Sequence, residues 1–129
     1  MGKWLTRCTE FAYFLLRVGV AVLFFFHGAQ KLAGAFGGAA VPLISLRGAA
    51  GVIEAVIPPF IALGLFTSWA AVVGTAEMST AYYLSHHPRP GWPIQNGGEL
   101  SLLYAVVFLF MLCRGGGAYS LDRLFRKKP

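Results

Sequence analysis

The sequence predicts an all-α membrane protein, built as an antiparallel bundle of four transmembrane helices. The chain of 129 residues is 57% hydrophobic and 12% charged, whereas soluble domains carry about 25% charged residues. It contains four apolar segments of the length needed to cross about 30 Å of hydrocarbon at about 1.5 Å per helical residue. These residues are enough for one domain and no more. The composition therefore favours a bilayer over water as the solvent of the fold.

The four spans are predicted at about residues 9–30, 48–66, 68–85 and 98–113. The apolar, Gly-rich segment between the first two is broken by Pro42, so we expect it to lie at the membrane interface or against the bundle. The second connection is very short, which forces an antiparallel hairpin. The third, HHPRPGWPIQNGG, contains three prolines and is expected to form a rigid cap.

Basic residues are divided unequally between the two sides of the predicted bundle. Four spans place both termini on one side, and excess Lys and Arg mark the cytoplasmic side of a membrane. Both termini are therefore predicted to be cytoplasmic, with residues 114–129 as a basic tail that can contact anionic lipid headgroups. The net charge of +6 belongs to these flanks, so no nucleic-acid partner is expected. The terminal side holds Lys3, Arg7, Arg114, Arg123, Arg126, Lys127 and Lys128, and the other side holds Lys31, Arg47 and Arg89.

Ionisable residues inside the spans are the main functional signal. A charge at the bilayer centre costs roughly 2.5–3.5 kcal/mol on insertion scales, so several in one small bundle are expected to face one another. Arg17 and Glu77 both fall near the middle of their spans. They are predicted to form a buried charge network that fixes helix register. Glu54 and Glu99 fall in the outer half.

The first span ends in FFFHGAQKLAG, where His27 and Lys31 are four residues apart and share a helix face. The cations of this segment are expected to face the carboxylates of the second and fourth spans. The candidate ligand site therefore consists of His27, Lys31, Glu54 and Glu99. At 3.6 residues per turn, one stripe of the first span holds Arg17, Phe24, Gly28 and Lys31, with His27 beside it.

The number of charges predicted inside the spans indicates that one of the ionisable groups binds a proton. Arg17 and Lys31 supply two positive charges against three carboxylates, so either His27 is protonated or one carboxyl keeps its proton. The cluster is then a natural place for proton uptake or release. No metal site is predicted, although His27, Glu54, Glu99 and His86 are metal-ligating residue types.

The second span contains Pro58 and Pro59. Because neither can donate a backbone hydrogen bond, the carbonyls four residues earlier lose their helical partners. A kink is predicted here. It either leaves polar backbone beside Glu54 to line a cavity, or simply bends the helix to fit its neighbours.

Taken together, these motifs resemble the DoxX family of small four-helix membrane proteins. The matching stretches cover nearly the whole chain: RVGVAVLFFFHGAQKLAG, GVIEAVIPPFIALGLFT, NGGELSLLYAVVFLF and GGGAYSLDRL. The chain departs from the usual family pattern at Ser68 and at the glycines of residues 115–117. The resemblance implies a multi-pass protein of a bacterial or archaeal cytoplasmic membrane.

The resemblance also implies a role in redox chemistry. The related DoxD protein is the membrane subunit of a thiosulfate:quinone oxidoreductase, so the chain is expected to be an accessory subunit of a membrane-bound redox complex that contacts quinone. No flavin, haem or iron–sulfur motif is present in the sequence, so no intrinsic cofactor is expected and electrons must come from a protein partner. Two alternatives stay open: a non-catalytic assembly subunit, and a small-solute or proton transporter acting as a homo-oligomer.

Overall fold

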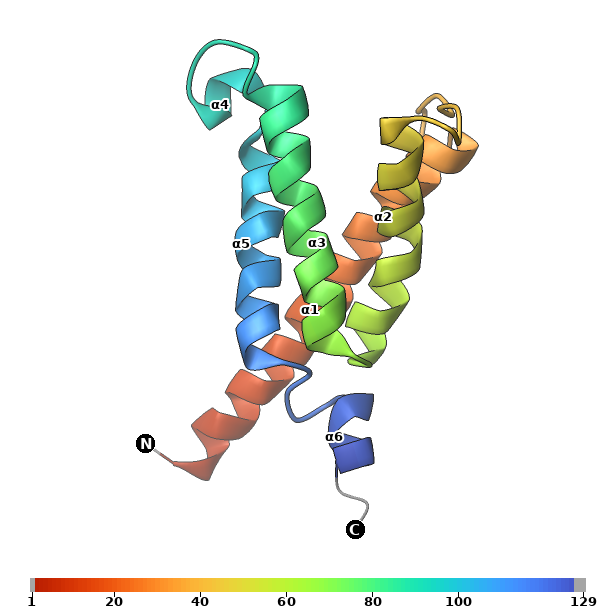
Figure 1. The fold of residues 1–129 in the computed structure, drawn as a ribbon. Coiled ribbons are helices and arrows are strands. Elements are labelled where there is room, and N and C mark those ends of the chain that lie inside the picture. Colours follow the sequence, from red (N-terminus) through yellow and green to blue (C-terminus); the bar gives the residue numbers. More distant parts are fainter. Residues whose placement is uncertain (1, 127–129) are drawn as a thin grey trace.

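The chain is helical over most of its length (Figure 1). The computed structural model describes residues 2–126, and over these residues it contains no strand. The all-α fold class is therefore confirmed. The elements are α1 (Lys3–Ala33), α2 (Leu46–Leu63), α3 (Thr67–Ala81), the π-helical turn η1 (Tyr82–His86), α4 (Pro93–Asn96), α5 (Glu99–Arg114) and α6 (Leu121–Arg126).

Two of the helices, α1 and α2, are long and apolar enough to cross a membrane. α3 and α5 are shorter, with 15 and 16 residues respectively, whereas a transmembrane helix typically needs about 20 residues. η1 extends α3 directly by five residues. α2 continues from Leu46 to Leu63 with Pro58 and Pro59 inside it, and the kink expected there stays a prediction.

Two glycines set where the first two long helices end. Gly34 follows α1 and Gly64 follows α2, each with φ of +66°, a left-handed conformation that favours glycine because it has no Cβ. Both donate their N–H groups to carbonyls of the preceding helix. At the other end of the first connection, the Ser45 hydroxyl accepts a hydrogen bond from Gly48 N–H and caps the start of α2. After Leu63, only the three residues 64–66 connect α2 to α3, and they close the hairpin between these helices.

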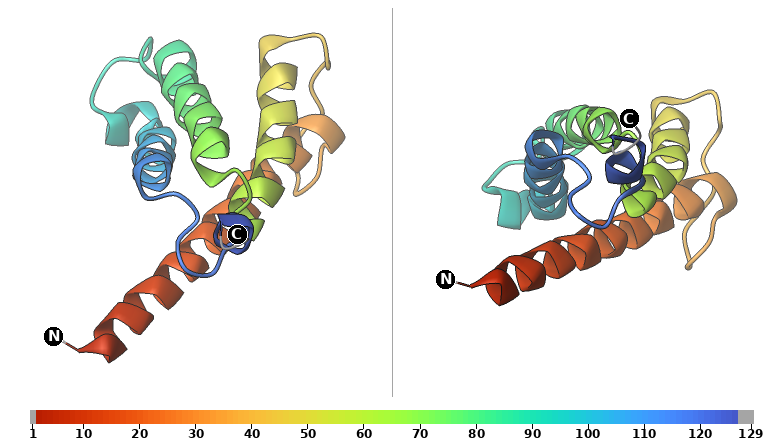
Figure 2. Two further views of the ribbon diagram at one scale, coloured as in Figure 1. Left: turned by 60° about the horizontal axis from the view of Figure 1, so that its bottom comes forward. Right: turned by 90° about the horizontal axis from the view of Figure 1, so that it is seen from below.

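The long helices pack in pairs. α1 contacts α2, α3 contacts α5, and α2 lies beside α3. Seen along the helices, α1 runs across one side of the row formed by α2, α3 and α5 (Figure 2). The start of α1 and the short helix α6 lie at one end of the molecule, which we call the terminal end (Figure 1). α4 and the end of α1 lie at the opposite end, the α4 end.

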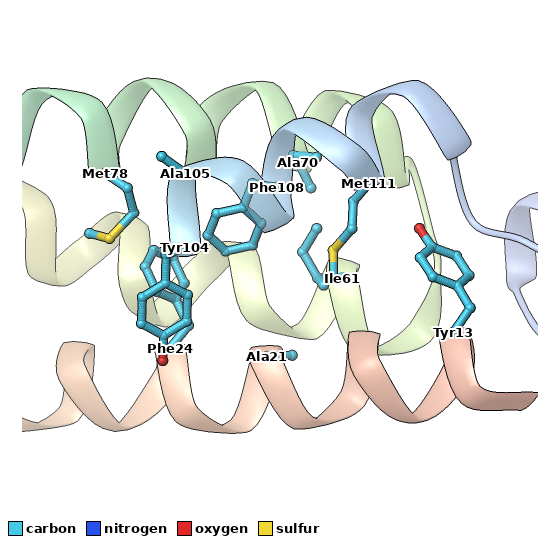
Figure 3. Close-up of a cluster of buried hydrophobic side chains, with 11 residues drawn as sticks. Tyr13, Ala21, Phe24, Ile61, Ala70, Met78, Tyr104, Ala105, Phe108 and Met111 are labelled. Atoms are coloured by element: carbon cyan, nitrogen blue, oxygen red, sulfur yellow. The ribbon is translucent and has the colours of Figure 1, made fainter. Parts of the chain in front are cut away.

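A narrow hydrophobic core joins the two pairs (Figure 3). Phe24 of α1, Ile61 of α2 and Phe108 of α5 are fully buried within it. The core is thin because many large apolar side chains point outward, including Val22, Val56, Leu103 and Phe110. Outward-facing apolar surface on this scale is typical of helices solvated by lipid.

Candidate functional site

The centre of the candidate site is an ion pair between α1 and α2. Lys31 Nζ lies 2.5 Å from Glu54 Oε1 and 2.6 Å from Oε2, and the Glu54 side chain is only 1% exposed. Both oxygens of this carboxylate therefore receive a charge-assisted hydrogen bond from one ammonium group. The sequence predicted that the cation of the HGAQK segment faces a carboxylate of the second span, and the structure brings these two residues together.

Small residues allow this contact. A Cβ atom on Gly28 of α1 would lie 2.8 Å from Ala55 N and from the Glu54 carbonyl carbon, both in the α2 backbone. A Cβ on Gly51 would lie 3.0 Å from the Lys31 Cβ atom. The two helices thus approach almost backbone to backbone one turn away from the ion pair. This close approach is what lets the Lys31 side chain reach a buried carboxylate.

Glu77 of α3 is the third member of the site. It is 9% exposed, and its Oε2 atom is buried without a hydrogen-bond partner among residues 2–126. It lies within electrostatic range of both Glu54 and Lys31. We call Lys31, Glu54 and Glu77 the charged cluster. It combines one cation with two carboxyl groups contributed by three different helices.

An aromatic cluster adjoins these charges. Phe24 packs against Tyr104 and Phe108 of α5, with ring centroids 5.4 and 5.0 Å apart (Figure 3). His27 meets the Tyr104 ring edge to face at 6.0 Å, and Tyr104 lies within electrostatic range of Glu54. Tyr104 was not expected from the sequence, because one tyrosine in an apolar helix does not reveal which way it faces.

The remaining expected site residues are placed differently. His27 is half-buried and neighbours the charged cluster through Tyr104. Glu99 is exposed at the first position of α5 and makes no side-chain hydrogen bond or ion pair within residues 2–126. The set of four predicted for ligand binding therefore does not gather. Glu99 stays outside the set because it is the first residue of α5, where its side chain is exposed and does not enter the interior of the bundle.

Arg17 corrects a second expectation. The helix stripe containing it is confirmed, since Arg17, Phe24 and Gly28 are all buried on α1. However, its guanidinium donates to the backbone carbonyls of Ala62 (3.1 Å), Tyr119 (2.8 Å) and Gly116, and not to Glu77. Arg17 and Lys31 are fourteen positions apart, about 21 Å along a helix. Glu77 is within electrostatic range of Lys31, whereas Arg17 is not among the charges that act on it.

The metal alternative is not supported by the arrangement. Within residues 2–126, no three His, Cys, Asp or Glu side chains are grouped in a way that could hold a metal ion. His86 instead lies in η1, where its Nδ1 atom is 3.3 Å from the Asn96 carbonyl oxygen. The candidates His27, Glu54, Glu99 and His86 thus do not form one centre.

A polar network at the terminal end explains the YSLD motif. The Asp122 carboxylate accepts hydrogen bonds from Phe66 N–H (2.7 Å), Thr67 N–H (2.9 Å) and the Thr67 hydroxyl (2.8 Å). It therefore caps the first turn of α3 from α6. Partial burial alone raises the pKa of Asp122, but these hydrogen bonds and the nearby Arg126 charge outweigh it, so the pKa is lowered. Asp122 is consequently ionised at neutral pH.

The first helix takes part in the same network. Glu10 pairs with Arg114 at the end of α5 and accepts a hydrogen bond from Ala118 N–H at 2.8 Å. The Tyr13 hydroxyl donates to the Gly115 carbonyl at 2.6 Å. Together with Arg17, these residues fasten the loop between α5 and α6 to α1. The motifs near both ends of the chain thus have a structural role at the terminal end.

Comparison with known proteins assigns the family. The family model DoxX matches residues 12–87, which is more than half of the chain. The chain belongs to the DoxX family. A relative from Haemophilus influenzae is 41% identical over 128 residues, covering 90% of this DoxX chain and 93% of the relative. The likeness therefore runs nearly from end to end.

A second relative from Haemophilus influenzae is 35% identical over 75 residues, covering 57% of this chain and 49% of the relative. Both relatives are described as uncharacterized proteins, so neither description names an activity. No solved structure matches the chain. DoxX membership and the two long apolar helices indicate a small membrane protein in contact with the lipid bilayer.

Proposed function

We propose that this DoxX protein is a small accessory subunit of a membrane-bound redox complex, and that it contacts quinone at the charged cluster. The observation that supports this most is the Lys31–Glu54 pair with Glu77 beside it, because ionisable residues at membrane depth are rare outside functional sites. The chain supplies no redox cofactor motif of its own. Electrons therefore come from a partner protein.

The donor set suits a quinone headgroup. A quinone needs a hydrogen-bond donor near each carbonyl oxygen, and the Lys31 ammonium has three N–H groups of which Glu54 accepts two. His27 and Tyr104 carry further polar hydrogens beside it. The ring of Phe24 provides an apolar, flat neighbour. The expected contribution of Glu99 is withdrawn, and Glu77 takes its place as the second carboxyl group.

The proposed topology has four transmembrane helices (α1, α2, α3 with η1, and α5) with both termini in the cytoplasm of a bacterial or archaeal cell. It is supported by the excess of basic residues at the terminal end and by the outward-facing apolar side chains of all four helices. The charged cluster then lies toward the outer leaflet, where the headgroup of a lipid-soluble quinone can reach it.

The test is purification from native membranes in mild detergent, followed by mass spectrometry of co-purifying proteins and of extracted quinone. The wild-type chain should carry an oxidoreductase partner and quinone. The Lys31→Met variant should keep the partner and lose the quinone, since it removes the proposed donor. Glu99→Gln is the matched control and should keep both, because Glu99 is exposed and outside the cluster.

Other outcomes reject the proposal in favour of a named alternative. A complex without quinone, or loss of the partner in Lys31→Met, assigns the ion pair to assembly. A chain that purifies with neither partner nor quinone favours a transporter. Proton flux measured in liposomes then decides that case, and a homo-oligomer is required because one four-helix chain offers little room for a pathway.

A further inference from the structure

The charges of the charged cluster do not balance. Lys31 contributes one positive charge, while Glu54 and Glu77 together carry two negative charges when both are ionised. The neighbouring titratable groups are His27 of α1 and Tyr104 of α5. The other cation predicted for the interior, Arg17, is held by backbone carbonyls at the terminal end. The cluster therefore has one carboxyl group more than its cation can neutralise.

The geometry identifies which carboxyl group is in excess. Both Glu54 oxygens accept hydrogen bonds from Lys31, whereas Glu77 Oε2 is buried with no partner in the described part of the chain. An isolated ionised carboxylate is very costly to bury, and such a group takes up a proton instead. An acid that is protonated needs no counterion. The carboxyl group that lacks a partner is thus the one suited to hold a proton.

From this arrangement we propose that Glu77 is a proton-binding site, and that Lys31 exchanges between Glu54 and Glu77 as the proton moves. In the resting arrangement Lys31 pairs with ionised Glu54 while Glu77 carries the proton. Release breaks the O–H bond of Glu77 and passes the proton to water or to a bound acceptor. If the proton goes to Glu54 instead, Lys31 moves to Glu77. One ionised carboxylate is then always paired with the cation.

The side chain of Lys31 suits this exchange. It comes from the last turn of α1, it is 21% exposed, and its flexible stem carries three donors. The two carboxyl groups come from different helices, α2 and α3. In this proposal the exchange is carried by motion of one long side chain between two helices. This inference holds for any ligand and does not depend on quinone.

The test is infrared spectroscopy of the purified protein in lipid, which detects the C=O stretch of protonated carboxyl groups during a pH titration. The wild-type protein should show such a band at neutral pH, and the band should disappear as the pH rises. Glu77→Gln should lack it. Glu99→Gln, the exposed control, should keep it. A wild-type spectrum without the band at neutral pH, or a band unchanged in Glu77→Gln, overturns the proposal.

A second variant should also lose the band, and it does so without removal of Glu77. In Glu54→Gln only one carboxylate remains to share Lys31, so Glu77 should ionise and the band should be lost at neutral pH although Glu77 is present. A band that persists in Glu54→Gln overturns the exchange of Lys31. Glutamine matches the shape of protonated glutamic acid, and circular dichroism of each variant verifies that its helices are intact.

Discussion

Replacing Gly28 with alanine should separate α1 from α2 and weaken the fold. The new Cβ atom would lie 2.8 Å from Ala55 N and from the Glu54 carbonyl carbon, and 2.9 Å from the Gly51 carbonyl oxygen. These are backbone atoms, so no side chain can rotate out of the way. Bringing the 2.8 Å contacts to an ordinary 3.4 Å requires the helices to move apart by about 0.6 Å. Such overpacking typically costs about 1–3 kcal/mol.

Gly19 provides a matched control on the same helix. A Cβ atom there meets nothing within 4 Å, so Gly19→Ala gains only the helix propensity of alanine, about 1 kcal/mol. Gly28→Ala gains the same propensity and pays the steric cost in addition. We therefore expect Gly28→Ala to be less stable than Gly19→Ala by about 1–3 kcal/mol.

The assay is unfolding by sodium dodecyl sulfate in mixed micelles, followed by circular dichroism. The comparison of the two variants is decisive because both replace glycine with alanine in α1. Equal free energies of unfolding would refute the close backbone approach, and with it the explanation of how Lys31 reaches Glu54. If Gly28→Ala is less stable than Gly19→Ala, the result supports the close backbone approach and the explanation of the Lys31–Glu54 contact.

Three further predictions concern the terminal end and the cluster. Arg17→Met removes a buried donor of three carbonyl hydrogen bonds, each of which contributes about 1.5–3 kcal/mol because the donor is charged. The free energy of unfolding should therefore fall by at least about 4.5 kcal/mol in the same micelle titration, and a wild-type value contradicts this prediction. The pKa of Asp122 is lowered from 3.8 on folding, so its stabilising contribution is complete above about pH 4 and is lost as the pH falls through the folded-state pKa. Asp122→Asn should therefore be less stable than wild type at neutral pH, and its free energy of unfolding should depend less on pH in the acid range. The same pH dependence in both proteins would contradict this prediction. Tyr104→Phe keeps the packing against Phe24 and should leave the free energy of unfolding within about 1 kcal/mol of wild type. Quinone retention measured by mass spectrometry should fall, because the variant lacks the hydroxyl donor, and unchanged retention would exclude Tyr104 as a donor.

The sequence was most informative where a pattern has one physical solution. Apolar length predicts the long helices, and helical periodicity predicts the buried stripe of α1. The meeting of Lys31 and Glu54 was also predictable, because a buried cation and a buried carboxylate at similar depth stabilise each other.

What could not be predicted was the register between helices that are distant in sequence. Arg17 and Glu77 both fall near the middle of their predicted spans, so pairing them was reasonable, but depth within a span does not specify the partner. Arg17 donates instead to the backbone carbonyls of Gly116 and Tyr119, and no sequence pattern marks a carbonyl as an acceptor for a distant side chain. Glu99 illustrates the same limit, since a residue at a helix boundary can face either the bundle or the polar surface.

The contacts of Arg17 have a consequence for the order in which the protein is made. Two of the three acceptors of this arginine lie in the loop after α5, so they leave the ribosome about one hundred residues later than Arg17 itself. Until this loop has been made, only the Ala62 carbonyl of α2 is available among the three acceptors of the guanidinium. The hydrogen bonding of the first helix is thereby completed only by the segment after α5, and chains stopped before Gly116 are expected to fold less stably than the full chain.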